Sequence, residues 1–92
     1  MPELYEIDYD IRVEDDFATL DRAARRRVMD AVDLRLGSSP EKYGRPLGGR
    51  FAGLRRLRVG DVRIVYRVVG RKVVVLAALT RRDVYEVLDR RL

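Results

Sequence analysis

Clustered arginines are the residues of this sequence whose type and spacing best fit a chemical role. Arg56, Arg58 and Arg63 lie close together in the second half of the chain. A planar guanidinium group donates two parallel hydrogen bonds to a phosphate, so such a cluster predicts phosphate binding. Tyr85 follows near the C-terminus and adds a hydroxyl group that could accept a proton and a ring that could stack on a base.

The charge of the chain is unevenly distributed. Its net charge is +5, but residues 1–20 hold seven acidic residues and one basic residue. The remaining residues hold 19 basic and 8 acidic residues, and 18 of the 20 basic residues in the chain are arginine. Nucleic acid is the partner that such a surplus favours. The alternative is that the arginines are solvent-exposed surface residues that bind no partner.

The composition excludes several kinds of chemistry. The sequence has no cysteine and no histidine, which removes disulfide bonds, thiolate nucleophiles, imidazole bases and the usual zinc sites. We therefore expect no metal and no cofactor. No apolar run approaches the roughly 20 residues that span a bilayer, and the acidic N-terminus is unlike a signal peptide. The sequence predicts a cytoplasmic protein with no membrane contact.

The length of the chain predicts a single domain, residues 1–92, because so short a chain builds one modest core. Apolar and acidic residues alternate over residues 4–11, which predicts a half-buried strand. Apolar residues then recur at helical spacing from Glu14 to Leu36. This spacing predicts two helices, or one helix bent at Asp21.

A region rich in glycine and proline follows the predicted helices. Gly37 is expected to cap the second helix and Pro40 to stop it. Residues 37–53 hold five of the seven glycines, so we interpret them as an ordered loop. Its basic residues are further candidates for RNA contact, together with two arginines of the preceding helix: Lys42, Arg45, Arg50, Arg25 and Arg26.

Two glycine-led turns organise the C-terminal half of the chain. Gly60 and Gly70 each stand first in a two-residue turn of the kind that joins antiparallel strands. They predict a three-stranded meander with strands at residues 54–59, 62–69 and 72–79. Apolar residues near the C-terminus predict a short final helix that covers part of the sheet. The predicted fold class is α+β, with an N-terminal strand and a helical hairpin packed on the meander.

The register of the first hairpin brings the arginines together. A two-residue turn places Arg58 opposite Arg63 and puts Arg56 on the same face. Like charges that face each other destabilise a ladder, so the side chains either splay into solvent or bind an anion. The second turn places Arg63 opposite Ala78, which ends the last strand beside this pair. We expect the residues that follow to reach the same corner: Thr80, Arg81, Arg82, Asp83 and Tyr85.

The order of elements and two segments, GLRRLRVGDVRIVYRV and RRDVY, resemble the RelE/ParE superfamily of toxins from toxin–antitoxin modules. The resemblance covers nearly the whole chain and is closest in pattern to the RelE-like mRNA interferases. It implies a RelE-like fold, a cognate antitoxin, and the ribosome, mRNA and 16S ribosomal RNA as partners. The implied reaction is cleavage of mRNA in the ribosomal A site, in which a ribose 2′-oxygen attacks the adjacent phosphate and leaves a 2′,3′-cyclic phosphate.

The resemblance also implies roles for individual residues. Arg58, Arg63, Tyr85 and either Arg81 or Arg82 correspond by position to catalytic residues of the superfamily, and we assign the catalytic role to Arg81. Arg56 and Arg82 also correspond to basic positions of the superfamily, and we expect them to bind phosphate. The basic residues of the loop and helix are candidates from their charge alone.

Two departures from the pattern keep alternatives open. Arginine is a poor proton acceptor where relatives often carry lysine, and Leu79 and Thr80 stand where some relatives have histidine. One alternative is a ParE-like toxin that inhibits DNA gyrase without cleaving RNA. Another is a catalytically weak module that binds the antitoxin or the ribosome.

Overall fold

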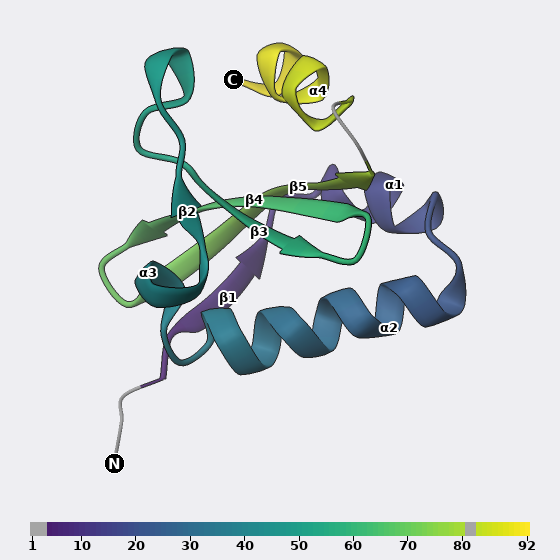
Figure 1. Ribbon diagram of the computed structural model, residues 1–92, viewed down its shortest axis with the longest axis horizontal. Coiled ribbons are helices and arrows are strands. Elements are labelled where there is room, and N and C mark those ends of the chain that lie inside the picture. The colour runs from purple at the N-terminus through teal and green to yellow at the C-terminus, as the bar shows by residue number, and fades with distance from the viewer. Residues whose placement is uncertain (1–3, 81–82) are drawn as a thin grey trace.

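The computed structural model describes residues 4–80 and 83–92. At its centre is a five-stranded mixed sheet in the order β1-β5-β4-β3-β2 (Figure 1). The strands are β1 Glu6–Tyr9, β2 Arg45–Pro46, β3 Arg55–Val59, β4 Val62–Val69 and β5 Lys72–Thr80. β1 pairs with β5 in parallel, and the other neighbours pair antiparallel. The fold class is α+β, as the sequence predicts.

The helical segment breaks where the sequence predicts. The helices of the described residues are α1 Val13–Ala18, α2 Arg22–Ala31, α3 Pro40–Tyr43 and α4 Asp83–Arg91. Asp21 separates α1 from α2, and its side chain accepts a hydrogen bond of 2.7 Å from the backbone N–H of Ala24. This contact caps α2, because a helix leaves its first backbone N–H groups without partners. A π-helical turn, Val32–Leu36, extends α2.

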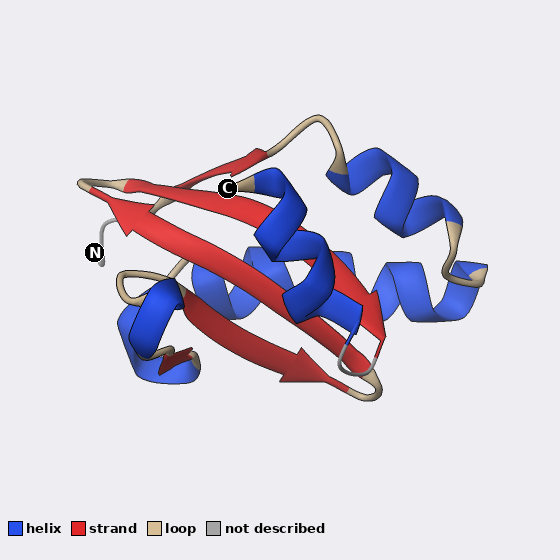
Figure 2. Ribbon diagram, turned by 90° about the horizontal axis from the view of Figure 1, so that it is seen from above, coloured by secondary structure: helices blue, strands red, loops and turns tan. Residues whose placement is uncertain are grey.

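Helices cover both faces of the sheet (Figure 2). One core lies between the sheet and the α1–α2 pair, and its members include Val28, Val32, Leu36, Ile64 and Tyr66. The other core lies between the sheet and α4, and its members include Val65, Leu76, Ala77, Val84 and Leu88. The prediction that the final helix covers part of the sheet is therefore confirmed.

The N-terminal strand and the glycine-rich segment differ from the prediction. The strand is limited to Glu6–Tyr9 rather than residues 4–11, because the parallel ladder with β5 pairs only residues 6–9 of this segment. Residues 37–53 are more than a loop, since they contain α3, β2 and a 3₁₀ turn. Pro40 begins α3 instead of ending a helix, which fits its preset φ and missing N–H. Gly37 caps the π-helical turn in an ordinary right-handed conformation.

The register of the second hairpin also differs from the prediction. Pairing starts at Val69 and Lys72 as expected, but Tyr66 pairs with Val75 and Val65 pairs with Ala77. Leu76 is thus an extra residue in β5, a β-bulge, and Arg63 lies opposite Leu79 rather than Ala78. The bulge allows two consecutive residues, Leu76 and Ala77, to join the core beneath α4.

Two buried tyrosine hydroxyls give a matched pair of stability tests. The hydroxyl of Tyr66 donates a hydrogen bond to the carbonyl of Pro40, whereas the buried hydroxyl of Tyr9 has no partner among the described residues. We expect Tyr66→Phe to lower the free energy of unfolding by about 1 kcal/mol or more, because it leaves a buried carbonyl unsatisfied. Tyr9→Phe should leave it unchanged or raise it by up to about 1 kcal/mol. Urea denaturation at pH 7 measures both changes.

The same measurement at high pH provides the control. Burial, with a smaller contribution from the charge of Asp33, raises the pKa of Tyr9 from 10.0 to about 12. A raised folded-state pKa contributes stability that is complete below pH 10 and is lost as the pH rises to about 12. Tyr9→Phe should therefore lose less stability than the wild type between pH 9 and pH 11. A larger loss in the variant would contradict this assignment.

Candidate nucleic-acid interface

The β3–β4 hairpin places three arginines on one face of the sheet. Arg58 pairs directly with Arg63, and Arg56 pairs with Val65. The turn that sets this register begins at Gly60, whose φ of 59° suits a residue without a side chain. The predicted pairing is confirmed.

Helix α4 brings Tyr85 to the same face. The side chain of Arg56 donates a hydrogen bond of 2.9 Å from Nη1 to the hydroxyl oxygen of Tyr85. The ring of Tyr85 lies 5.8 Å from that of Phe51, measured between centroids. Val84 next to it is fully buried, so the first turn of α4 packs against the sheet. We call Arg56, Arg58, Arg63 and Tyr85 the arginine corner.

The two facing arginines of the corner lack a carboxylate partner within the described part of the chain. Arg58 is exposed, and its Nε donates to the carbonyl of Gly60 over 3.3 Å. Arg63 is half-buried and makes no ion pair with the described side chains of residues 4–80 and 84–92. Two adjacent cations that form no ion pair favour an anion between or beside them. Arg81 and Arg82, which the sequence also assigns to this corner, lie outside the described residues.

A basic groove runs from the arginine corner to the short strand β2. Its cavity volume is about 450 Å³, and its lining contains four arginines and no acidic residue. Arg45 of β2 pairs with Arg56 of β3, so this candidate from the sequence is next to the corner. The lining is Arg35, Tyr43, Arg45, Arg56, Leu57 and Arg58.

Sequence reasoning missed two residues of this groove, Arg35 and Tyr43. Arg35 belongs to the π-helical turn and Tyr43 to α3. Helical periodicity gives no sign that either lies near β3, because their approach depends on how α3 and β2 pack on the hairpin. The aromatic residue among arginines is a feature of surfaces that bind single-stranded nucleic acid.

The other basic candidates do not join the corner. Arg25 and Arg26 lie on α2, which covers the opposite face of the sheet (Figure 2). Arg25 donates to the carbonyls of Phe17 and Leu20, over 3.2 Å and 3.3 Å, and so supports the turn between α1 and α2. Arg26 lies 3.9 Å from Asp30 in an exposed pair.

Two further candidates are Lys42 of α3 and Arg50 of the 3₁₀ turn that follows β2. Arg50 pairs with Asp89 of α4 at 3.2 Å. Lys42 lies over the ring of Tyr43, with 5.5 Å between Nζ and the ring centroid. Lys42 is therefore beside the basic groove, and Arg50 helps to hold α4.

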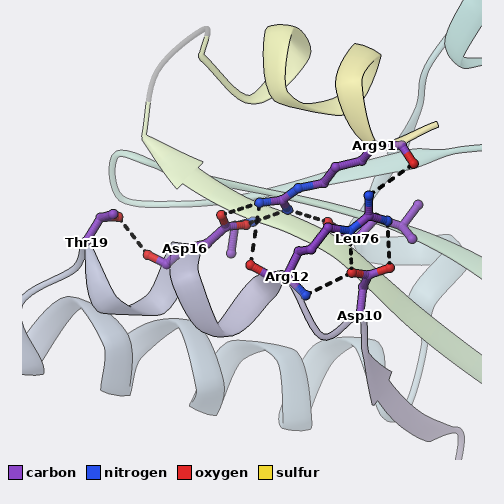
Figure 3. Close-up of polar contacts among 7 residues, drawn as sticks. Asp10, Arg12, Asp16, Thr19, Leu76 and Arg91 are labelled. Atoms are coloured by element: carbon purple, nitrogen blue, oxygen red, sulfur yellow. Dashed lines mark hydrogen bonds and ion pairs between the residues drawn. The ribbon is translucent and has the colours of Figure 1, made fainter.

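A polar network that the sequence did not reveal surrounds the last turn of α4 (Figure 3). Arg91 forms an ion pair with Asp16, with 2.7 Å between Nη2 and Oδ1, and both side chains are almost fully buried. Beside it, Asp10 accepts hydrogen bonds from the side chain and the backbone of Arg12. These bonds lower the pKa of Asp10 to about 2. The network joins α1, β5 and α4.

The described residues do not contain a group of three or more acidic, histidine or cysteine side chains that could hold a metal ion. Within the same residues, none of the helices has the length and apolar character needed to cross a membrane.

Comparison with known proteins gives the family context. A profile of the family described as "ParE toxin of type II toxin-antitoxin system, parDE" matches residues 3–85. No curated protein matches the sequence.

Solved structures of toxins share the fold. In the toxin–antitoxin complex RelBE2 from Mycobacterium tuberculosis, one chain is 25% identical, with a TM-score of 0.80 over 85% of this chain and 92% of that one. The toxin RelE from E. coli is 21% identical, with a TM-score of 0.75 over 97% and 98% of the two chains. A chain of the ParDE system from P. aeruginosa is 14% identical, with a TM-score of 0.70 over 85% of this chain and 97% of that one.

Proposed function

The chain belongs to the ParE toxin family of type II toxin–antitoxin systems, and we propose that it acts on RNA: it cleaves mRNA in the ribosomal A site, in the cytoplasm. The observation that carries this proposal is the arginine corner. Arg58 and Arg63 face each other and form no ion pair with the described carboxylates, and the hydroxyl of Tyr85 accepts a hydrogen bond from Arg56 on the same face. The corner thus combines cations for a phosphate with one group that can exchange a proton.

The proposed reaction assigns a role to each side chain. The ribose 2′-oxygen loses its proton, attacks the adjacent phosphorus and forms a new P–O bond. The bond to the 5′-oxygen breaks and this oxygen takes up a proton in exchange, so that a 2′,3′-cyclic phosphate and a 5′-hydroxyl result. Arg58 and Arg63 neutralise the charge that grows on the pentacoordinate phosphorus, which is the stabilisation that usually dominates catalysis. Tyr85 accepts the proton of the 2′-hydroxyl or stacks on a base, and in the second case the ribosome supplies the proton acceptor.

Inhibition of DNA gyrase is the second candidate function. The match to the ParE profile favours it, as does the lack of lysine and histidine in the arginine corner, because arginine remains charged and accepts no proton at neutral pH. In this case the basic groove would bind an acidic surface of gyrase or its DNA.

Structures of toxin–antitoxin complexes such as RelBE2 support a cognate antitoxin as a partner. A segment of the antitoxin that covers the basic groove should be acidic, since the groove is lined by four arginines and no acid.

One pair of assays separates the two functions. Purified protein is incubated with ribosomes programmed with labelled mRNA, and in parallel with gyrase and relaxed plasmid. The proposal predicts mRNA cut in the A site and unimpaired supercoiling. Intact mRNA together with blocked supercoiling would replace it with the gyrase function.

The hydroxyl of Tyr85 provides a specific test of catalysis. We expect Tyr85→Phe to lower the cleavage rate on programmed ribosomes by about 10²-fold or more if the hydroxyl accepts the proton. The ring and its contact with Phe51 remain in this variant, so ribosome binding should change little. Tyr5→Phe is the matched control, because Tyr5 lies under Arg71 at the N-terminal part of the sheet. Equal rates for Tyr85→Phe and the wild type would limit Tyr85 to stacking.

A further inference from the structure

Helix α4 is held at its last turn by an ion pair that is buried between helices. The guanidinium of Arg91 contacts both carboxylate oxygens of Asp16, with 2.7 Å from Nη2 to Oδ1 and 2.9 Å from Nη1 to Oδ2. The side chains are 11% and 4% exposed. A pair so well shielded has a fixed geometry, unlike the exposed pairs on the rest of the surface.

The same two side chains satisfy the backbone at the β5 bulge. Asp16 accepts a hydrogen bond of 3.0 Å from the N–H of Ala78, and Arg91 donates one of 2.8 Å to the carbonyl of Leu76 (Figure 3). Leu76 is the residue that has no partner in β4. Because buried backbone groups need partners, this ion pair has one favourable position relative to the sheet.

The apolar contacts of α4 do not define its position in the same way. Val84 and Leu88 are fully buried against the sheet, but apolar burial has no direction and tolerates small rotations and shifts of a helix. The hydrogen bond from Arg56 to Tyr85 is directional and would break with such a shift. Tyr85 lies in the first turn of α4 and Arg91 in the last, about 9 Å apart along the axis.

We propose that Asp16 is a positioning residue for the arginine corner. Acting through Arg91 and the bulge in β5, Asp16 fixes the position of α4. The hydroxyl of Tyr85 therefore keeps its hydrogen bond with Arg56. The effect of Asp16 on catalysis rests on the proposed function, whereas its effect on Tyr85 does not. Asp16 lies on α1, and the described hydrogen bonds of its side chain are to Arg91 and to the backbone of Ala78, neither of which belongs to the arginine corner.

Asp16→Asn tests this inference in the full-length protein. Amide hydrogen exchange is measured for residues 84–91 and for β4, and the resonance of Tyr85 is followed with ¹³Cζ-labelled tyrosine and assigned through Tyr85→Phe. We expect exchange in α4 to rise roughly tenfold while β4 is unchanged. The Tyr85 signal should move toward that of an exposed tyrosine. Arg91→Gln removes the other partner of the ion pair and should change the exchange of α4 and the Tyr85 signal in the same way. It replaces Asp16→Asn as the test variant if Asp16→Asn does not fold.

The control is Asp30→Asn, which removes a partner of the exposed Arg26–Asp30 pair and should change neither readout. An unchanged Tyr85 signal in both test variants would overturn the inference, and so would a rise in exchange that is equal in α4 and β4. If the protein cleaves RNA, both variants should lower kcat and leave KM near its wild-type value. A wild type that does not cleave RNA would end the proposed reaction, but the exchange and resonance data would still decide the role of Asp16.

Discussion

Replacement of Arg63 by alanine is expected to lower the rate of mRNA cleavage by about 10²–10³-fold, the usual effect of removing one preorganised donor to a developing negative charge. Arg63 is half-buried and faces Arg58 across the ladder. Its charge is therefore held close to a second cation and away from bulk solvent, where it interacts strongly with a phosphate. Single-turnover cleavage on programmed ribosomes measures the loss.

The chain provides a matched control on the same strand. Arg67 is exposed, lies on the same face of β4 and is four residues, or about 13 Å, further along. Arg67→Ala changes the net charge by the same amount but leaves the arginine corner intact, so its cleavage rate should remain within about threefold of the wild type. Equal losses in the two variants would mean that only the total charge of the protein matters.

Arg63→Lys refines the interpretation. Lysine keeps the charge but lacks the planar fork that binds two phosphate oxygens at once. We expect a rate between those of the wild type and Arg63→Ala. A cleavage rate of Arg63→Lys as low as that of Arg63→Ala would indicate that binding of two phosphate oxygens by one guanidinium is needed. A rate equal to that of the wild type would indicate that the positive charge alone is enough.

The first hairpin was predictable because its determinants are local. Gly60 and Gly70 both have positive φ, 59° and 60°, and a two-residue turn leaves the flanking strands one register. The pairing of Arg58 with Arg63 follows directly from it. The break at Asp21 was predictable for the same reason, since a capping side chain acts on the next turn of its own helix.

The second hairpin was only partly predictable because its register depends on tertiary packing. Leu76 and Ala77 both enter the core beneath α4, and the sequence of β5 does not show that a helix from the end of the chain will cover this point. The partner of Asp16 was hidden for a similar reason, since Arg91 is 75 positions away. Composition suggests that Arg91 is one more solvated arginine, and only the fold identifies it as buried.

The candidate site shows the same division between local and tertiary signals. Tyr85 was expected beside Arg58 and Arg63, and its hydrogen-bond partner is Arg56, on the same face of β3 as Arg58. Arg25 was assigned to RNA from its charge alone, yet its guanidinium donates to carbonyls at the end of α1. The charge of the sequence thus predicts an anionic partner. The packing of the helices on the sheet determines which arginines are free to bind one.

The largest expected effect on stability comes from Gly44, the residue between α3 and β2. A Cβ atom at this position would overlap the hydroxyl of Tyr66 and lie 2.7 Å from its Cζ. Tyr66 cannot move away easily, because its side chain is fully buried and its hydroxyl donates a hydrogen bond to the carbonyl of Pro40. We expect Gly44→Ala to lower the free energy of unfolding by about 3 kcal/mol, at the upper end of the usual cost of overpacking. Urea denaturation measures the change.

Gly48→Ala separates this steric effect from a general cost of replacing glycine. Gly48 has an extended backbone with φ of −112°, and a Cβ atom there meets nothing within 4 Å. Its replacement should therefore leave stability unchanged or raise it by about 0.5 kcal/mol through the unfolded state. The double variant Gly44→Ala with Tyr66→Phe should recover part of the loss, since removing the hydroxyl removes the shortest of the contacts with the new methyl group. If the double variant is less stable than Gly44→Ala alone, the contact with the Tyr66 hydroxyl is not the cause.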